Sequence, residues 1–209
     1  MKNADSLTSN SNPLSESRVI YLIEDDDDCR SNIAQFLNLK GYQVFSYPAA
    51  DGFLREALVA PAVLVSDMQM PGLTGVDVQT VLIERGVEMP MIFISGESTF
   101  QQAVQAMKQG AAEFLAKPVS PEELLLAIER AFEKLSIEAA TYITKLSLEV
   151  KLQKLSPRER MVYDLLREGF SNPQLVDRMG ISMPTVKEYK ANVFRKLEIE
   201  HLSELMKLH

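Results

Sequence analysis

Residues 62–71, AVLVSDMQMP, decide the fold of this chain. The apolar run 62–65 is too short for a helix and is typical of a buried strand. Asp67 comes at the end of that run, just before a turn signal at Pro71-Gly72. Because ligands bind at the carboxyl ends of the strands in an open parallel sheet, an aspartate placed there can serve as a nucleophile or as a metal ligand.

Short apolar runs alternate with stretches of helical periodicity on either side of that segment. The runs are residues 19–23, 44–47, 62–66, 91–95 and 114–116. Strands that alternate with helices indicate βα units and a parallel sheet covered on both faces. The predicted fold class of the first part of the chain is therefore α/β.

Composition places the chain among globular proteins of a reducing compartment. It has 209 residues, 46% of them hydrophobic, and a single cysteine, so an internal disulfide is excluded. Residues 1–17 are rich in Ser and Asn and lack the apolar core of a signal peptide, which predicts a disordered lead-in. No apolar run approaches the roughly 18 residues that a membrane span needs. We expect a soluble, cytoplasmic protein that does not associate with membranes.

The charge and helix signals change near residue 155. Residues 1–154 carry 13 Lys+Arg and 21 Asp+Glu, a net of −8, whereas residues 155–209 carry 9 and 8, a net of +1. No Gly or Pro occurs between Pro121 and Pro157, which predicts a helical connector. Ser156 and Glu159 have capping-box spacing, and three or four short helices follow. The sequence therefore predicts a second, smaller all-α domain.

An acidic cluster is expected at one edge of the sheet. Glu24 and Asp25 follow the first strand, and Asp67 ends the third. If the strand order reverses between those strands, the three carboxylates share one crevice. Two carboxylates about 4 Å apart repel by roughly 4 kcal/mol at an effective dielectric near 20, so a divalent cation is favoured. Oxygen ligands of this number suit Mg²⁺ or Mn²⁺. Asp27 and Asp28 are better explained as acids that favour a helix N-terminus.

Two further groups suit chemistry on a phosphoryl group at Asp67. Ser95 ends the fourth strand and could donate a hydrogen bond to a phosphoryl oxygen, and Lys117 ends the fifth and could pair with it as a point charge. Taken alone, Ser95 could equally lie near a helix N-cap, and Lys117 could be a solvated surface lysine. Their joint placement at strand ends favours the functional interpretation. Lys117-Pro118 is also a candidate cis peptide bond.

Residues 18–135 resemble the receiver domain of two-component response regulators, the CheY-like family. The resemblance depends on Glu24-Asp25, on Asp67 with Met70-Pro71 and Gly75, on Ser95-Gly96 and on Lys117-Pro118. It implies a flavodoxin-like (βα)5 fold with Asp67 as phospho-acceptor. It also implies that Asp25, Asp67 and the Gln69 backbone carbonyl ligate Mg²⁺, with Glu24 acting through a water, and that Ser95 and Lys117 contact the phosphoryl group. Phe114 would be the aromatic side chain that rotates with them.

The tail has the pattern of a helix-turn-helix, with one helix expected at residues 172–179 and a second from Met183 or Pro184 to Leu197. It resembles the LuxR-type module of the FixJ/NarL regulators through Ser156-Pro157-Arg158-Glu159, Gly180-Ile181-Ser182, Thr185-Val186-Lys187 and residues 192–197. The resemblance implies that Lys187 and Glu188 lie near base edges and that Thr185, Lys190 and Lys196 lie near phosphates. Pro173, Pro184, Glu188 and Tyr189 depart from the usual pattern.

These features lead to one functional hypothesis with two alternatives. The chain would comprise a receiver at 18–135, a helical linker at 136–154 and a LuxR-type DNA-binding domain at 155–209. A partner histidine kinase would phosphorylate Asp67, and the resulting homodimer would bind double-stranded DNA and regulate transcription. One alternative uses the tail for protein interaction, because Glu188 repels phosphate and the basic charge is weak. The other is a Mg²⁺-dependent aspartyl phosphohydrolase, but Gln69 stands where its general acid would be required.

Overall fold

The computed structural model describes residues 18–96 and 100–208. Their contacts divide the chain between Ser136 and Ile137 into two compact units. The predicted lead-in, residues 1–17, lies outside the described residues, and the domain limits at 135, 136 and 155 stay predictions. Within the described ranges, no helix combines the length and the apolar character that a membrane crossing requires.

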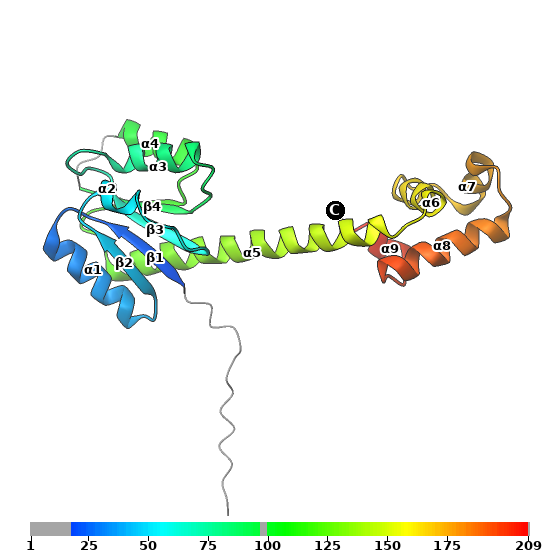
Figure 1. The fold of residues 1–209 in the computed structure, drawn as a ribbon, viewed down its shortest axis with the longest axis horizontal. Coiled ribbons are helices and arrows are strands. Elements are labelled where there is room, and N and C mark those ends of the chain that lie inside the picture. Colours follow the sequence, from blue (N-terminus) through cyan, green and yellow to red (C-terminus); the bar gives the residue numbers. More distant parts are fainter. Residues whose placement is uncertain (1–17, 97–99, 209) are drawn as a thin grey trace, which may run out of the picture. The chain divides into compact units, whose positions relative to one another are not determined.

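The first unit contains one parallel sheet, and each predicted apolar run contributes a strand to it (Figure 1). The strands are β1 (Val19–Ile23), β2 (Gln43–Tyr47), β3 (Ala62–Asp67), β4 (Met91–Ser95) and β5 (Glu113–Ala116). Their order is β2-β1-β3-β4-β5, and every neighbouring pair is parallel. The order reverses between β1 and β3, which confirms the predicted flavodoxin-like arrangement.

Helices cover both faces of this sheet. They are α1 (Asp27–Leu39), α2 (Ala50–Phe53), α3 (Gly75–Glu84), α4 (Phe100–Lys108) and α5 (Pro121–Gln153). Successive residues of a strand point to opposite faces. Thus Tyr21 packs in a core with side chains of α2, α3 and α4, whereas Leu22 packs in a second core with side chains of α1 and α5. In Figure 1, α3 and α4 accordingly lie on one side of the sheet and α1 on the other.

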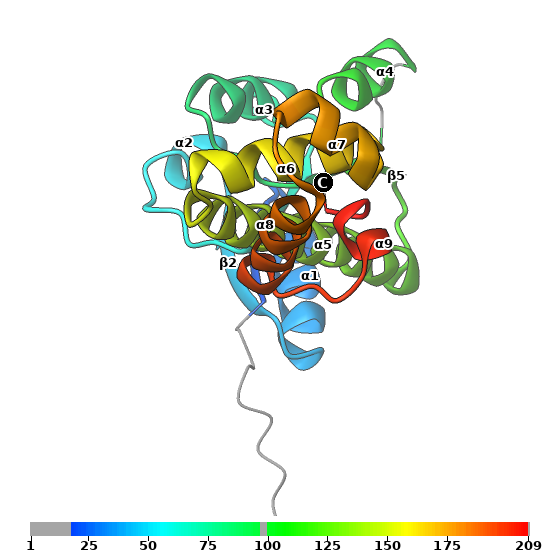
Figure 2. The same cartoon turned by 90° about the vertical axis from the view of Figure 1, so that its right-hand side faces the viewer.

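The second unit is all-α, as predicted, and Figure 2 faces it. After the last turns of α5 come α6 (Pro157–Arg167), α7 (Asn172–Met179), α8 (Met183–Leu197) and α9 (Leu202–Leu205). One core joins them, with Val162, Leu175 and Val193 fully buried and with Leu148 and Leu152 of α5 packed against it.

Local signals set the limits of these helices. The Ser156 N–H donates to Glu159 Oε2 over 2.7 Å, and the Glu159 N–H donates to Ser156 Oγ over 3.3 Å, so the predicted capping box begins α6. Gly180 ends α7 at φ 63°, in the left-handed region that glycine enters without steric cost. The chain can therefore turn sharply from α7 into α8, which gives the helix-turn-helix its geometry.

Candidate functional site

The acidic cluster lies at the carboxyl edge of the sheet, where the sequence predicts it. The strand register pairs Ile23 with Ser66, so the residues that follow, Glu24 and Asp67, are neighbours. Carboxylate oxygens of Glu24, Asp25 and Asp67 all lie within 4.8 Å of one another. Glu24 and Asp67 are buried, at 1% and 7% exposure, whereas Asp25 is exposed. The crevice is therefore open to solvent on the Asp25 side.

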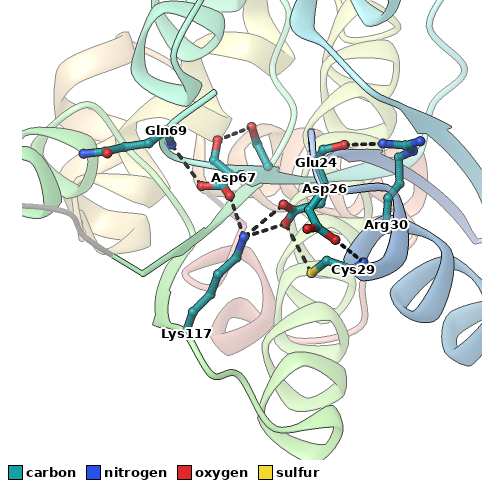
Figure 3. Close-up of polar contacts among 8 residues, drawn as sticks. Glu24, Asp26, Cys29, Arg30, Asp67, Gln69 and Lys117 are labelled. Carbon is teal, nitrogen blue, oxygen red and sulfur yellow. Dashed lines mark hydrogen bonds and ion pairs between the residues drawn. The ribbon is translucent and has the colours of Figure 1, made fainter. Parts of the chain in front are cut away.

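Lys117 joins both buried carboxylates (Figure 3). Its Nζ donates to Glu24 Oε1 and Oε2 at 3.0 and 2.8 Å and to Asp67 Oδ2 at 2.5 Å. Burial lowers the pKa of Lys117, but the hydrogen bonds to Asp67 and Glu24 outweigh it and hold that pKa above its ordinary value. Burial, together with the nearby Asp67 charge, raises the pKa of Glu24. One ammonium thus serves two carboxylates, and the cluster keeps a negative charge.

Ser95 brings a buried hydroxyl to the same edge. Its side chain is 3% exposed, and its Oγ has no hydrogen-bond partner among residues 18–96 and 100–208. Buried hydroxyls are nearly always paired, so an unpaired one calls for a ligand or another explanation. The Ser95 carbonyl accepts from the Lys117 N–H over 2.8 Å, which fixes the two strand ends beside each other. The Lys117-Pro118 bond is cis, as predicted.

Backbone contacts fix the position of the Asp67 carboxylate. The Gln69 N–H donates to Asp67 Oδ1 over 2.9 Å, while the Gln69 side chain is exposed and points away from the carboxylates (Figure 3). Gly75 begins α3 directly behind this turn. A Cβ at position 75 would lie 2.6 Å from the Asp67 carbonyl oxygen and 2.8 Å from the Phe93 ring. Only glycine therefore permits this approach of α3 to β3.

Two residues at the start of α1 contact the cluster and were not predicted from the sequence. The Cys29 thiol donates to Glu24 Oε2 over 3.5 Å, and Arg30 Nη1 donates to the Glu24 carbonyl over 2.8 Å. Burial and the Glu24 charge raise the pKa of Cys29 to about 11. Asp26 caps α1 by accepting from the Cys29 N–H at 2.7 Å, and Arg30 also pairs with Asp27. The signal that could have located both contacts is Asp26, an N-cap residue that follows β1 closely and so places the first turn of α1 next to Glu24.

The donor set fits a hard divalent cation. Three carboxylates with one ammonium leave excess negative charge, and oxygen is the donor that Mg²⁺ and Mn²⁺ prefer. Phe114 is half-buried on β5 and packs against the core on the α3 and α4 side of the sheet. The functional roles assigned to these residues from the sequence remain predictions.

The predicted DNA-contacting residues lie on α8, in two different environments. Lys187 and Glu188 are exposed. Thr185 lies one turn from the N-cap, where its hydroxyl is 2.8 Å from Ser182 Oγ. Lys190 Nζ lies 5.4 Å from the centroid of the Phe194 ring. Exposed polar side chains near the N-terminus of such a helix are those that can reach base edges.

Lys196 is engaged within its own unit. Its Nζ donates to Glu159 Oε2 at 2.6 Å and to the Lys154 carbonyl at 3.0 Å. The Lys196 hydrogen bond lowers the pKa of the buried Glu159, and the Ser156 N–H adds to the effect. Tyr189, which departs from the usual pattern, packs against the core of this unit. The phosphate contact predicted for Lys196 stays a prediction, and this ion pair gives the residue a structural role as well.

Comparison with known families divides the chain in the same way. The family model for the response regulator receiver domain matches residues 20–129, and that for bacterial regulatory proteins of the luxR family matches residues 153–209. FixJ, a transcriptional regulatory protein of Rhizobium meliloti, is 33% identical over 190 residues, which cover 90% of this chain and 93% of FixJ. Response regulator protein TodT of Pseudomonas putida is 34% identical over 192 residues, covering 91% of this chain and 84% of TodT.

Solved structures agree with these relatives. The structure of response regulator StyR matches with a TM-score of 0.74 at 31% identity, covering 92% of this chain and 98% of that one. Full-length FixJ from B. japonicum matches with a TM-score of 0.59 at 32% identity, covering 91% and 95%. Both domains and their order are thus shared along nearly the whole length. The chain belongs to the family of transcriptional response regulators that join a receiver domain to a LuxR-type DNA-binding domain.

Proposed function

We propose that this chain is a cytoplasmic transcription factor whose DNA binding is switched by phosphorylation of Asp67. The observation that carries the proposal is the environment of the Asp67 carboxylate. It is buried, bonded to Lys117 Nζ at 2.5 Å, and placed at the strand edge that also holds the Ser95 hydroxyl, which has no partner among the described residues. A cation and a free donor beside a fixed carboxylate are what a transferred phosphoryl group requires.

The donor in this proposal is the phosphohistidine of a sensor kinase. The N–P bond of the phosphohistidine breaks, and a bond forms between phosphorus and an oxygen of Asp67, so no oxidant or reductant is needed. A bound Mg²⁺ or Mn²⁺, held by Asp25, Asp67 and the Gln69 carbonyl with support from Glu24, would supply charge neutralisation at the phosphoryl oxygens. Ser95 donates its hydroxyl to one of those oxygens, and Lys117 Nζ pairs with another.

The switch then works by redistributing these contacts. Once Ser95 and Lys117 bind the phosphoryl group, the strand ends that carry them shift, and Phe114 on β5 moves with them. The face of the receiver that carries β5 then pairs with the same face of a second chain. Two helix-turn-helix modules are held together in this way, and linking them raises the avidity for two half-sites. The modules contact DNA through Thr185, Lys187, Glu188, Lys190 and Lys196.

Intact-mass spectrometry tests the phospho-acceptor. The full chain, incubated with acetyl phosphate and Mg²⁺, should gain the mass of one phosphate, and hydroxylamine should remove it as expected of an acyl phosphate. Asp67→Asn should gain none. Asp28→Asn is the matched control, because Asp28 is an exposed acid in the first turn of α1. Phosphate that persists in the Asp67→Asn protein would refute the assignment.

DNA binding is tested by selection from genomic fragments, followed by gel shifts on the enriched sequence. Phosphorylated wild type should bind more tightly than Asp67→Asn treated in the same way. Lys187→Ala should weaken binding without changing stability. Lys190→Ala, which removes a predicted bond to phosphate, should reduce the salt slope by about 1. Equal binding by wild type and Asp67→Asn would contradict the gating. Retention of no duplex would favour a tail that binds protein.

The phosphohydrolase alternative is less well supported. Such an enzyme needs a general acid two residues beyond its nucleophile, and Gln69 is an amide whose side chain points away from Asp67 (Figure 3). We therefore propose that the chain has no steady turnover on phosphate monoesters. Sustained release of inorganic phosphate from such a substrate, abolished in Asp67→Asn, would contradict this.

A further inference from the structure

Exposed apolar side chains are concentrated on the last turns of α5. Of the fifteen large apolar side chains that are exposed among the described residues, five lie within residues 137–150. Three of them, Ile143, Leu146 and Val150, are 66%, 49% and 47% exposed. Together with the small residue Ala139 they have the spacing i, i+4, i+7, i+11, and we name these four residues the α5 stripe. Contiguous apolar surface of this kind marks a site of interaction.

The last turns of this helix, from Leu148 to Leu152, are covered on the side away from the α5 stripe. Leu148 and Leu152 pack on the core of the second unit, and Lys151 Nζ pairs with Glu198 at 2.8 Å. If Ile143 and Val150 are assigned to heptad position a and Leu146 to d, Leu148 falls at f, diametrically opposite the seam. The unit therefore covers the back of α5 from Leu148 onward and leaves the α5 stripe open, while residues 139–147 are exposed.

The residue types on the α5 stripe select its occupant. β-branched residues at a combined with Leu at d favour a parallel, two-stranded coiled coil. In the same register Glu149 occupies g, and Lys154, one residue beyond the end of α5, occupies the following e position. Parallel strands bring g of one helix to e of the next heptad in the other, so Glu149 would face Lys154 of a second copy. Both the apolar pattern and the charges are thus complementary to the same chain.

We propose that residues 139–154 of two copies pair as a short parallel coiled coil through the α5 stripe. This inference rests on the proposed function, because about two heptads are too short to hold two chains together unaided. Pairing of phosphorylated receivers raises the local concentration of the two α5 stripes, and the two stripes then pack against each other. Because Leu148 lies at f, each DNA-binding module is carried on the outside of the pair.

Cysteine crosslinking in the full chain tests the seam. Leu146→Cys places a thiol at d, and the matched control Thr144→Cys places one at the exposed b position, away from the seam. After acetyl phosphate treatment and mild oxidation, Leu146→Cys should form about tenfold more disulfide-linked dimer than Thr144→Cys. Wild type, which retains Cys29, measures any crosslink through the natural thiol. Equal crosslinking of the two variants would overturn the proposal.

A charge exchange tests the parallel register independently. Glu149→Lys and Lys154→Glu should each weaken dimerisation about fivefold in sedimentation experiments, because each places like charges opposite one another. The double variant should restore wild-type affinity, since the pairs re-form with exchanged partners. A double variant no better than the two single ones would overturn the register.

The outcomes also separate this proposal from the proposed function. If phosphorylated wild type is dimeric by light scattering but Leu146→Cys does not crosslink, only the coiled coil fails. If phosphorylated wild type stays monomeric, the proposed function fails and the coiled coil fails with it. In the unphosphorylated monomer the thiol of Leu146→Cys should react with maleimide as fast as that of Thr144→Cys. Strong protection there would indicate cover by the same chain and would overturn the proposal.

Discussion

Each unit of the molecule contains a lysine paired with a buried glutamate, and the two pairs differ in a way that separates function from stability. Lys117 meets Glu24 at 2.8 Å, and Lys196 meets Glu159 at 2.6 Å. The glutamate side chains are 1% and 7% exposed, so both are desolvated. Yet the pKa of Glu24 is raised, chiefly by burial, whereas that of Glu159 is lowered, chiefly by its lysine.

The difference lies in how completely the charges of each pair are balanced, not in the number of hydrogen bonds, since Glu24 accepts on both oxygens from Lys117 and also from the Cys29 thiol. Glu159 accepts from Lys196 and from the Ser156 N–H, and Lys196 also donates to the Lys154 carbonyl. Glu24 shares its lysine with Asp67, and the Ser95 hydroxyl at the same edge has no partner among the described residues. A satisfied pair stabilises the fold, whereas an unsatisfied one is kept where something else must bind.

If the pocket around Glu24 and Asp67 is not held together by balanced charges, the packing of α3 against β3 must hold it in place. Gly75→Ala would force a Cβ to 2.6 Å from the Asp67 carbonyl, so the free energy of unfolding should fall by about 1–3 kcal/mol. Gly96→Ala is the control, because a Cβ there meets only ordinary contacts at 3.7 Å. Urea unfolding measures both, and equal stabilities would show that the pocket yields easily.

Removing the glutamate charge should destabilise the protein more at the Lys196–Glu159 pair, the satisfied pair, than at the Lys117–Glu24 pair. Glu159→Gln should lower the free energy of unfolding by about 1–2 kcal/mol, discounted because the Lys196 side chain is 30% exposed. A lowered folded pKa means that the contribution is complete above the ordinary glutamate pKa, about 4.3, and is lost as pH falls below it. Urea unfolding of wild type and variant over pH should therefore converge in acid. A constant difference would rule out the ion pair as its cause.

The unsatisfied pair should respond in the opposite direction. Without divalent cations, Glu24→Gln should leave the free energy of unfolding unchanged or raise it by up to about 1 kcal/mol, because it removes a carboxylate that burial and Asp67 disfavour. In the presence of Mg²⁺, the same variant should be phosphorylated at Asp67 more slowly than wild type. A loss as large as that of Glu159→Gln would erase the distinction between the two pairs.

The smallest effect concerns the reactivity of Cys29, with no change in stability. With a pKa of about 11, the thiol should react with iodoacetamide at pH 8 roughly a hundredfold more slowly than in the unfolded chain. The rate should rise with pH and should increase in Glu24→Gln, since the Glu24 charge contributes to the shift. Because the chain has one cysteine, labelling followed by mass spectrometry reads this site alone. Labelling as fast as in urea would contradict it.

The sequence was sufficient to predict contacts that follow from strand order and register. Glu24, Asp25 and Asp67 meet because β1 and β3 are neighbours with Ile23 opposite Ser66. The cis bond at Lys117-Pro118 was a candidate because cis peptide bonds are found almost entirely before proline, typically in tight turns.

Contacts that depend on helix placement escaped prediction. Cys29 and Arg30 reach Glu24 only because α1 starts immediately after Asp26 and turns back over the end of β1. The partner of Lys196 depends on how α8 crosses α6, which periodicity does not specify. The second cis bond, Ala60-Pro61, was also missed, because no expected site pointed to it.

One helix supplies side chains to two separate cores. Ile128 and Phe132 of α5 are buried in the receiver, while Leu148 and Leu152 of the same helix pack in the second unit. A protease fragment that began at Leu155 would lack both of the latter leucines and would melt at a lower temperature than one that kept residues 148–154. The second compact unit thus takes part of its core from inside α5, the helix that also completes the core of the first.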